Sequence, residues 1–79
     1  MLDSRVKFDE KMDNCLYFNI PREFFPDVEI EDDMCELSVD IRENLGVVVE
    51  IKIKDCDWKE VQIPQDEIIE LLKMALKEV

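Results

Sequence analysis

The most informative part of the sequence is residues 35–42, which read Cys35-Glu36-Leu37-Ser38-Val39-Asp40-Ile41-Arg42. Apolar side chains occupy the odd positions of this stretch, and polar side chains occupy the even ones. Successive side chains of a β-strand point to opposite faces. The alternation therefore predicts a strand with one face in the core and the other in water.

A second alternating stretch follows directly, and the two together predict a β-hairpin. Val47, Val49, Ile51 and Ile53 are expected to face the core. The intervening turn, residues 43–46, ends at Gly46, which is the single glycine of the chain. Hairpin turns often need a positive φ, which glycine adopts without a steric penalty. We therefore expect Gly46 to fix the register of this hairpin.

Three further strands are suggested on either side of this hairpin. Residues 58–63 predict a third strand, in which Val61 and Ile63 share a face, and Pro64 ends it because proline has no backbone donor. Residues 35–63 would then form a meander. Residues 5–9 and 15–20 also alternate, and they predict an N-terminal hairpin over residues 5–20.

Residues 65–79 change to the 3.6-residue period of an amphipathic helix. Its apolar side chains fall within an arc of about 160° on a helical wheel; they are Ile68, Ile69, Leu71, Leu72, Ala75, Leu76 and Val79. The meander and the helix can each hide their apolar face only against the other. The sequence thus predicts an α+β fold, a small two-layer domain over residues 1–79 with an antiparallel meander of three to five strands packed against one C-terminal helix.

The composition indicates a folded, acidic protein without the usual catalytic residues. The 79 residues include 21 acidic and 10 basic ones, no histidine and a net charge of −11, yet 47% are hydrophobic, which is high for a disordered acidic chain. Without histidine or a glycine-rich loop, the common nucleophilic and phosphate-binding sites are missing. We expect no enzyme and no cofactor.

Cysteine usage and hydropathy suggest a cytoplasmic protein. Cys15, Cys35 and Cys56 are an odd, widely spaced set with no CxxC pair, which favours free thiols over a zinc site. The charged N-terminus does not resemble a secretion signal, and no apolar run approaches the roughly 20 residues that span a bilayer.

The negative charge is concentrated in the middle of the chain. Residues 22–43 contain nine acids and two arginines, a net charge of −7. Direct binding of duplex DNA or of an anionic membrane would need cations, so a basic partner is the expected one. If the segment is extended, Asp27, Glu29 and Glu31 lie on one face, spaced like negative points along an edge.

We therefore expect a non-catalytic inhibitor that mimics DNA and occupies the basic nucleic-acid-binding groove of another protein. In size and charge the chain resembles the small acidic inhibitors that bacteriophages and mobile elements encode against restriction or CRISPR nucleases. The proposed contact residues are Asp27, Glu29, Glu31, Asp32, Asp33 and Glu36, with Asp40 and Glu43 extending the patch.

Three other interpretations remain open at this point. The acidic segment can be ordinary solvated surface that keeps a small protein soluble. The chain can be an assembly module whose sheet edge or helix makes a homodimer or docks in a larger complex, with its charge serving solubility. Trp58 and Met74 are separate candidate anchors for a partner. Calcium binding has the oxygen ligands it needs, but the segment does not fit the EF-hand pattern.

Overall fold

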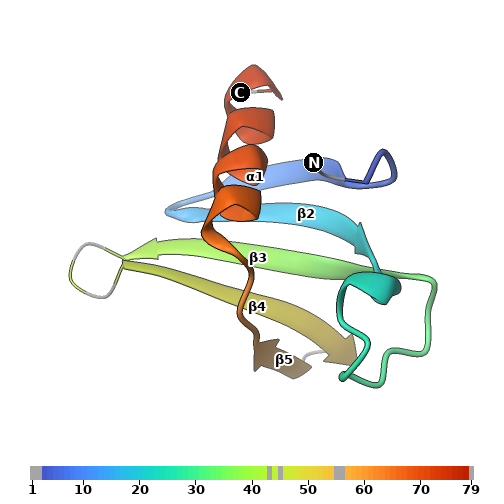
Figure 1. Cartoon of the computed structure of the whole chain (residues 1–79). Coiled ribbons are helices and arrows are strands. Elements are labelled where there is room, and N and C mark those ends of the chain that lie inside the picture. Colours follow the sequence, from blue (N-terminus) through green and yellow to red (C-terminus); the bar gives the residue numbers. More distant parts are fainter. Residues whose placement is uncertain (1–2, 43, 45, 55–56, 79) are drawn as a thin grey trace.

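The computed structural model describes residues 3–42, 44, 46–54 and 57–78, and in this part of the chain five strands and one α-helix form two layers (Figure 1). The strands are β1 (Lys7–Met12), β2 (Cys15–Pro21), β3 (Met34–Arg42), β4 (Gly46–Lys54) and β5 (Asp57–Glu60). A short 3₁₀ turn, η1 (Arg22–Phe24), follows β2, and helix α1 (Gln65–Glu78) ends the chain.

The sheet is an antiparallel meander in the order β1-β2-β3-β4-β5. The predicted N-terminal hairpin exists as β1 and β2, and it joins the main sheet because β2 pairs with β3 over seven residues. Helix α1 crosses one face of this sheet, with its C-terminal end nearest β1 (Figure 1). The predicted α+β fold is confirmed.

The core lies between α1 and the sheet, and its residues follow the predicted alternation. The fully buried side chains include Phe18, Ile20, Leu37, Val39 and Ile51 from the sheet and Leu71 from the helix. Phe8 packs edge-on against Phe18 with 5.5 Å between ring centroids. Between β2 and β3, Phe25 is buried in this core and Val28 packs against it.

Ile41 and Val47 lie on the predicted face of the sheet, but the prediction that they are buried in the core is wrong. They pair across β3 and β4 on the helix side of the sheet, but they remain 44% and 42% exposed. The alternation predicts which face a side chain takes, whereas burial also requires a covering element. The residues next to them on that face, Val39 and Val49, are buried.

The helix buries a narrower stripe than its apolar arc predicts. Leu71 and Ala75 are buried, but Ile69 and Leu76 are exposed, Leu76 to 77%. A helix on a flat sheet contacts it along one line, so side chains more than about 100° from that line meet solvent. Met74, considered above as an anchor, instead packs against the core. Val79 lies outside the described residues.

Two other strand boundaries differ from the prediction. Strand β1 covers Lys7–Met12 instead of residues 5–9, because the turn of this hairpin lies at Asp13 and Asn14. Strand β5 ends at Glu60 instead of Ile63, although Val61 still donates a hydrogen bond to the carbonyl of Val49. Residues 61–64 leave the sheet so that Pro64 can start the helix, where its carbonyl accepts bonds from the amides of Glu67 and Ile68. Gly46 has φ of 79°, which confirms the conformation expected of it.

Candidate functional site: an acidic loop and the hollow beside it

The acidic segment forms a compact loop between β2 and β3, which we call the acidic loop (residues 22–33). Its two ends meet where the amide of Arg22 donates a 3.0 Å hydrogen bond to the carbonyl of Asp33. It contains six carboxylates and the single cation Arg22, a net charge of −5. Short loops with close ends and inward side chains of their own are compact and are often functional.

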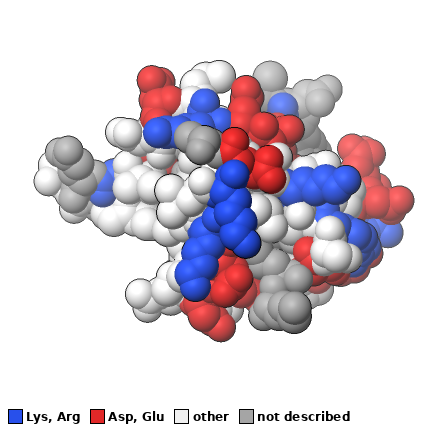
Figure 2. Space-filling model, turned by 90° about the horizontal axis from the view of Figure 1, so that it is seen from above, with Lys and Arg blue, Asp and Glu red and all other residues white. Residues whose placement is uncertain are grey.

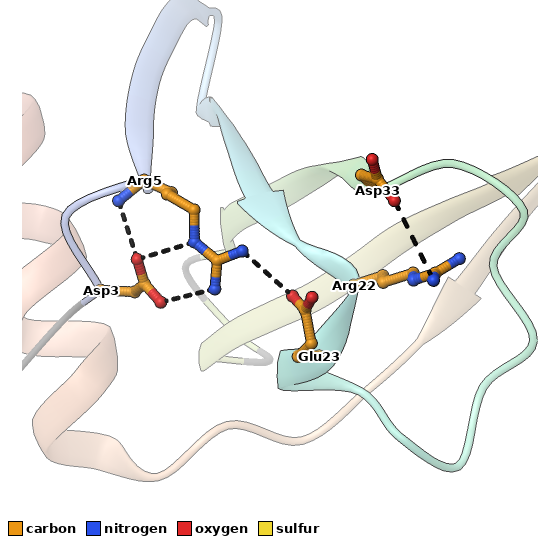
Figure 3. Close-up of polar contacts among 5 residues, drawn as sticks. All are labelled: Asp3, Arg5, Arg22, Glu23 and Asp33. Carbon is orange, nitrogen blue, oxygen red and sulfur yellow. Dashed lines mark hydrogen bonds and ion pairs between the residues drawn. The ribbon is translucent and has the colours of Figure 1, made fainter.

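Arg22 holds the loop together from its neck. Its Nη1 lies 3.5 Å from the carbonyl oxygen of Ile30 and 3.3 Å from that of Glu31. Its Nη2 lies 4.0 Å from the carboxylate of Asp33, an exposed and therefore weak ion pair (Figure 3). The guanidinium thus binds mainly backbone carbonyls, and it leaves the carboxylates of the loop facing outward.

The loop orients its side chains by the same alternation that the sequence suggested, but without extended geometry. Residues 26–28 and 31–33 form turns and bends, so the segment does not have the extended geometry that a regular row of Asp27, Glu29 and Glu31 would require. Val28 and Ile30 still pack against the core, which turns their neighbours outward. All six carboxylates of the loop are exposed; they are Glu23, Asp27, Glu29, Glu31, Asp32 and Asp33.

Part of this charge surrounds a hollow of about 370 Å³ where the loop joins the sheet. Its acidic lining is Glu31, Asp32 and Glu36, and the remaining lining residues are Ile30, Met34, Cys35, Lys52 and Ile53. Glu36 lies 3.9 Å from the Nζ of Lys52. The hollow therefore combines an apolar wall with an acidic rim, which suits a long basic side chain with an aliphatic stem.

The other two predicted contact residues do not join this group. Asp40 lies four residues beyond Glu36, about 13 Å along β3. Its carboxylate accepts a 2.7 Å bond from the Nε of Arg42, which neutralises it locally. Glu43 lies outside the described residues.

A second cluster of ion pairs joins the start of the loop to the N-terminal segment. Arg5 contacts Asp3 at 2.9 Å and Glu23 at 3.5 Å, and so it links the N-terminal segment to the start of the loop (Figure 3). Hydrogen bonds from Arg5 lower the pKa of Asp3 to about 2. The Arg5–Glu23 pair is exposed and therefore also weak, and the other five exposed carboxylates of the loop are the candidate contact groups.

The loop gives one end of the molecule its charge. In Figure 2 Asp and Glu side chains gather at the right-hand end, with Lys and Arg side chains beside them, where Figure 1 places the acidic loop. The carboxylates of the acidic loop therefore stay together at one end of the sheet.

No family model, curated protein or solved structure matches this chain.

Two negative findings apply to the described residues. Among them no three Cys, Asp or Glu side chains come close enough together to hold a metal ion. Helix α1 has 14 residues, and the described part of the chain contains no helix with the length and hydropathy that crossing a bilayer requires.

Sequence reasoning named Trp58 as a candidate contact residue, but it missed the hollow and the pairing of Trp58 with Tyr17 on the face of the sheet opposite α1. The hollow brings together the loop, β3 and β4, which are distant in sequence. The aromatic pair had a signal, since Tyr17 is out of phase with Leu16 and Phe18, and Trp58 is out of phase with Val61. Burial raises the pKa of Tyr17, with smaller contributions from Cys15 and Glu36, so its hydroxyl stays protonated at neutral pH.

Proposed function

We propose that this protein is a small non-catalytic binding protein that uses its acidic loop to occupy the basic nucleic-acid-binding groove of another protein. It would act in the cytoplasm as an inhibitor that mimics DNA. A restriction or CRISPR nuclease is a suitable target class, because such enzymes grip DNA with lysine and arginine in a groove.

The observation that carries this proposal is the outward display of five carboxylates on one anchored loop. Val28, Ile30 and Arg22 hold the loop from inside, so its charges need not be ordered when a partner binds. Preorganised charge of one sign attracts a complementary groove and speeds association. Solvated surface would not require such anchoring.

The test is capture of partners from a nuclease-treated bacterial lysate with two charge-matched variants. The loop variant replaces three Asp by Asn and two Glu by Gln at positions 27, 29, 31, 32 and 33. The control variant makes the same changes at five exposed positions elsewhere, namely Asp9, Asp13, Asp66, Glu70 and Glu78. Both carry the same net charge, so only the position of the carboxylates differs.

The proposal predicts a nucleic-acid-binding protein that the wild type and the control variant capture and the loop variant does not. Added duplex DNA should displace it from the wild type, because both ligands occupy one groove. Equal capture by the two variants, or capture that DNA leaves unchanged, would contradict DNA mimicry. Circular dichroism and thermal melting establish that both variants are folded.

A second candidate function is assembly through an apolar surface. The observation that favours it is the exposure of Ile41 and Val47 on the helix side of the sheet and of Ile69 and Leu76 on the helix. Exposed apolar side chains of this kind often mark protein contacts. Sedimentation at several concentrations tests this: a dimer lost in the Leu76→Lys variant supports assembly, and a monomer at all concentrations rejects self-association.

A further inference from the structure

The face of the sheet opposite α1, which we call the open face, carries an aromatic pair. Tyr17 on β2 and Trp58 on β5 have ring centroids 6.3 Å apart at an interplanar angle of 58°. Two strands, β3 and β4, lie between them, so both side chains must lean across the sheet. Ser38 lies on β3 between them and is only 6% exposed, which such a lean accounts for.

Beside this pair, two like charges face each other across neighbouring strands. Glu50 on β4 pairs directly with Glu60 on β5, in the same cross-strand row as Ser38 and Tyr17. Like charges in directly opposed positions destabilise a sheet. Among the described side chains, neither glutamate has a Lys or Arg nitrogen within 4.0 Å. Glu10 on β1 pairs with Tyr17 on β2 and adds a third carboxylate to this row.

On the open face one cation, the ammonium group of Lys52, already lies between an aromatic ring and a carboxylate. The Nζ of Lys52 lies 6.0 Å from the centroid of the Trp58 ring and 3.9 Å from the carboxylate of Glu36. A separation of about 6 Å is the outer limit of a cation–π contact. The ring is thus presented to a cation beside a carboxylate, while Trp58 itself remains 37% exposed.

The open face is also continuous with the acidic loop. Glu36 and Lys52 both line the hollow beside the loop. Lys52 also pairs with Trp58 across β4 and β5, and its Nζ lies 3.9 Å from Glu36, so it connects the hollow with the open face. A basic segment in the hollow would therefore extend directly onto the aromatic pair. The acidic loop and the open face both carry negative charge, and they adjoin at the hollow.

We propose that the open face is a docking surface for an arginine side chain of the basic partner, stacked on Trp58 and Tyr17 and paired with Glu50 and Glu60. A guanidinium is planar, stacks on aromatic rings and forms forked bonds to carboxylates, whereas an ammonium ion is a strongly hydrated point charge. The proposal rests on the proposed function only in requiring that the partner be basic. It adds a second contact surface and a preference for arginine over lysine.

The test is a titration with hexa-arginine and hexa-lysine peptides, followed by the fluorescence of Trp58, the single tryptophan of the chain. We expect hexa-arginine to change the emission saturably and to bind more tightly than hexa-lysine. The variant Glu50→Gln/Glu60→Gln should lose about fivefold in affinity, as two partly exposed ion pairs contribute. The control Glu70→Gln/Glu78→Gln removes the same charge from exposed positions of α1 and should lose less than half of that effect.

Three results would overturn this proposal. They are equal loss in the two double variants, equal affinity for the two peptides, and binding without any change in Trp58 emission. The variant Tyr17→Leu gives a further check, because it keeps the reporter and should remove the arginine preference. Melting curves establish that each variant is folded.

This titration is independent of the lysate experiment above. Arginine binding at the open face together with no DNA-displaceable partner would reject DNA mimicry and retain the docking surface. The opposite result is a DNA-displaceable partner that the Glu50→Gln/Glu60→Gln variant still captures, together with equal affinity for the two peptides. It would retain DNA mimicry and reject the docking surface.

Discussion

At the scale of single residues, Arg22 shows how one cation organises many carboxylates. It donates to the carbonyls of Ile30 and Glu31 and lies near Asp33, so it closes the acidic loop without neutralising most of its charge. The sequence marks Arg22 only as a positive charge in an acidic region. Its role depends on carbonyl groups eight and nine residues away, which the fold brings to it.

We expect Arg22→Gln to open the acidic loop. Loss of two side-chain hydrogen bonds, made at an exposed position, should lower the free energy of unfolding by about 1 kcal/mol. Hydrogen exchange measured by mass spectrometry should become faster in residues 22–33 and stay unchanged in β3 and β4. Unchanged exchange in the loop would mean that its core side chains alone hold it.

Substitution of Gly46 is expected to destabilise the protein through backbone strain alone. A Cβ at this position meets no atom within 4 Å, but φ is 79°, which L side chains rarely adopt. Gly46→Ala should therefore cost about 1 kcal/mol in urea unfolding, and Gly46→Asn should cost less, because asparagine tolerates this conformation. Equal losses in both variants would point to a cause other than φ.

Cys35 is expected to be the less reactive of the two described cysteines. Burial raises the pKa of its thiol from 9.0 to about 11, while Cys15 lies half-buried on the open face. Iodoacetamide at pH 8 should label Cys15 faster than Cys35 in the folded protein, and at comparable rates in urea. Peptide mass spectrometry measures both rates.

The same raised pKa gives a pH dependence of stability. The thiol of the unfolded chain ionises near pH 9, before that of the folded protein, so the contribution of Cys35 is complete below pH 9 and is lost between pH 9 and 11. The variant Cys35→Ala should show a smaller fall in stability over this range.

At the scale of elements, helix α1 differs from its sequence pattern in how much of it is covered. Leu71 has no exposed surface and Leu76 is 77% exposed, although both belong to the predicted apolar arc. The hydrophobic arc determines which side of the helix can pack. The line of contact with the sheet determines how much of that side is used.

This difference predicts unequal costs for two identical substitutions. Leu71→Ala should lower the free energy of unfolding by about 3 kcal/mol, because it leaves a cavity in the core. Leu76→Ala should change it by less than about 0.5 kcal/mol. Urea unfolding of both variants checks this, and a large loss at Leu76 would indicate that this side chain is covered in solution by another copy of the chain.

At the scale of the whole molecule, the acidic loop and the exposed pair Ile41 and Val47 lie at different ends of the sheet. The acidic loop occupies one end of the sheet, and Ile41 and Val47 lie toward the β3–β4 turn at the other (Figures 1 and 2). The two proposed kinds of binding therefore use separate surfaces. The two kinds of binding also differ in their response to salt, because salt screens the attraction between charges but does not weaken apolar contacts.

Raising the salt from about 0.05 to 0.5 M shortens the Debye length roughly threefold. Capture of a partner through the acidic loop should fall steeply over this range. Association through Ile41, Val47, Ile69 and Leu76 should be unchanged or stronger, since high salt does not weaken apolar contacts. Calorimetric titration of the purified partner at both salt concentrations measures the difference, and a salt-independent affinity would contradict the electrostatic mechanism.

Much of the fold follows from local pattern. The alternation in residues 35–42 and 47–53, the positive φ of Gly46 and the helical period after Pro64 are properties of neighbouring residues, so the sequence is enough to predict a meander with one helix. The outward direction of Asp27, Glu29 and Glu31 is local in the same sense, because Val28 and Ile30 between them are drawn to the core.

The remaining features depend on residues far apart in the chain. Exposure of Ile41 and Leu76 is set by where α1 crosses the sheet, the hollow needs the acidic loop beside β4, and the aromatic pair needs β2 and β5 at a fixed separation. Side-chain periodicity repeats over two to four residues and carries no information about such distances. They are fixed by the register of the strands and by packing, and these arise only when the whole chain has folded.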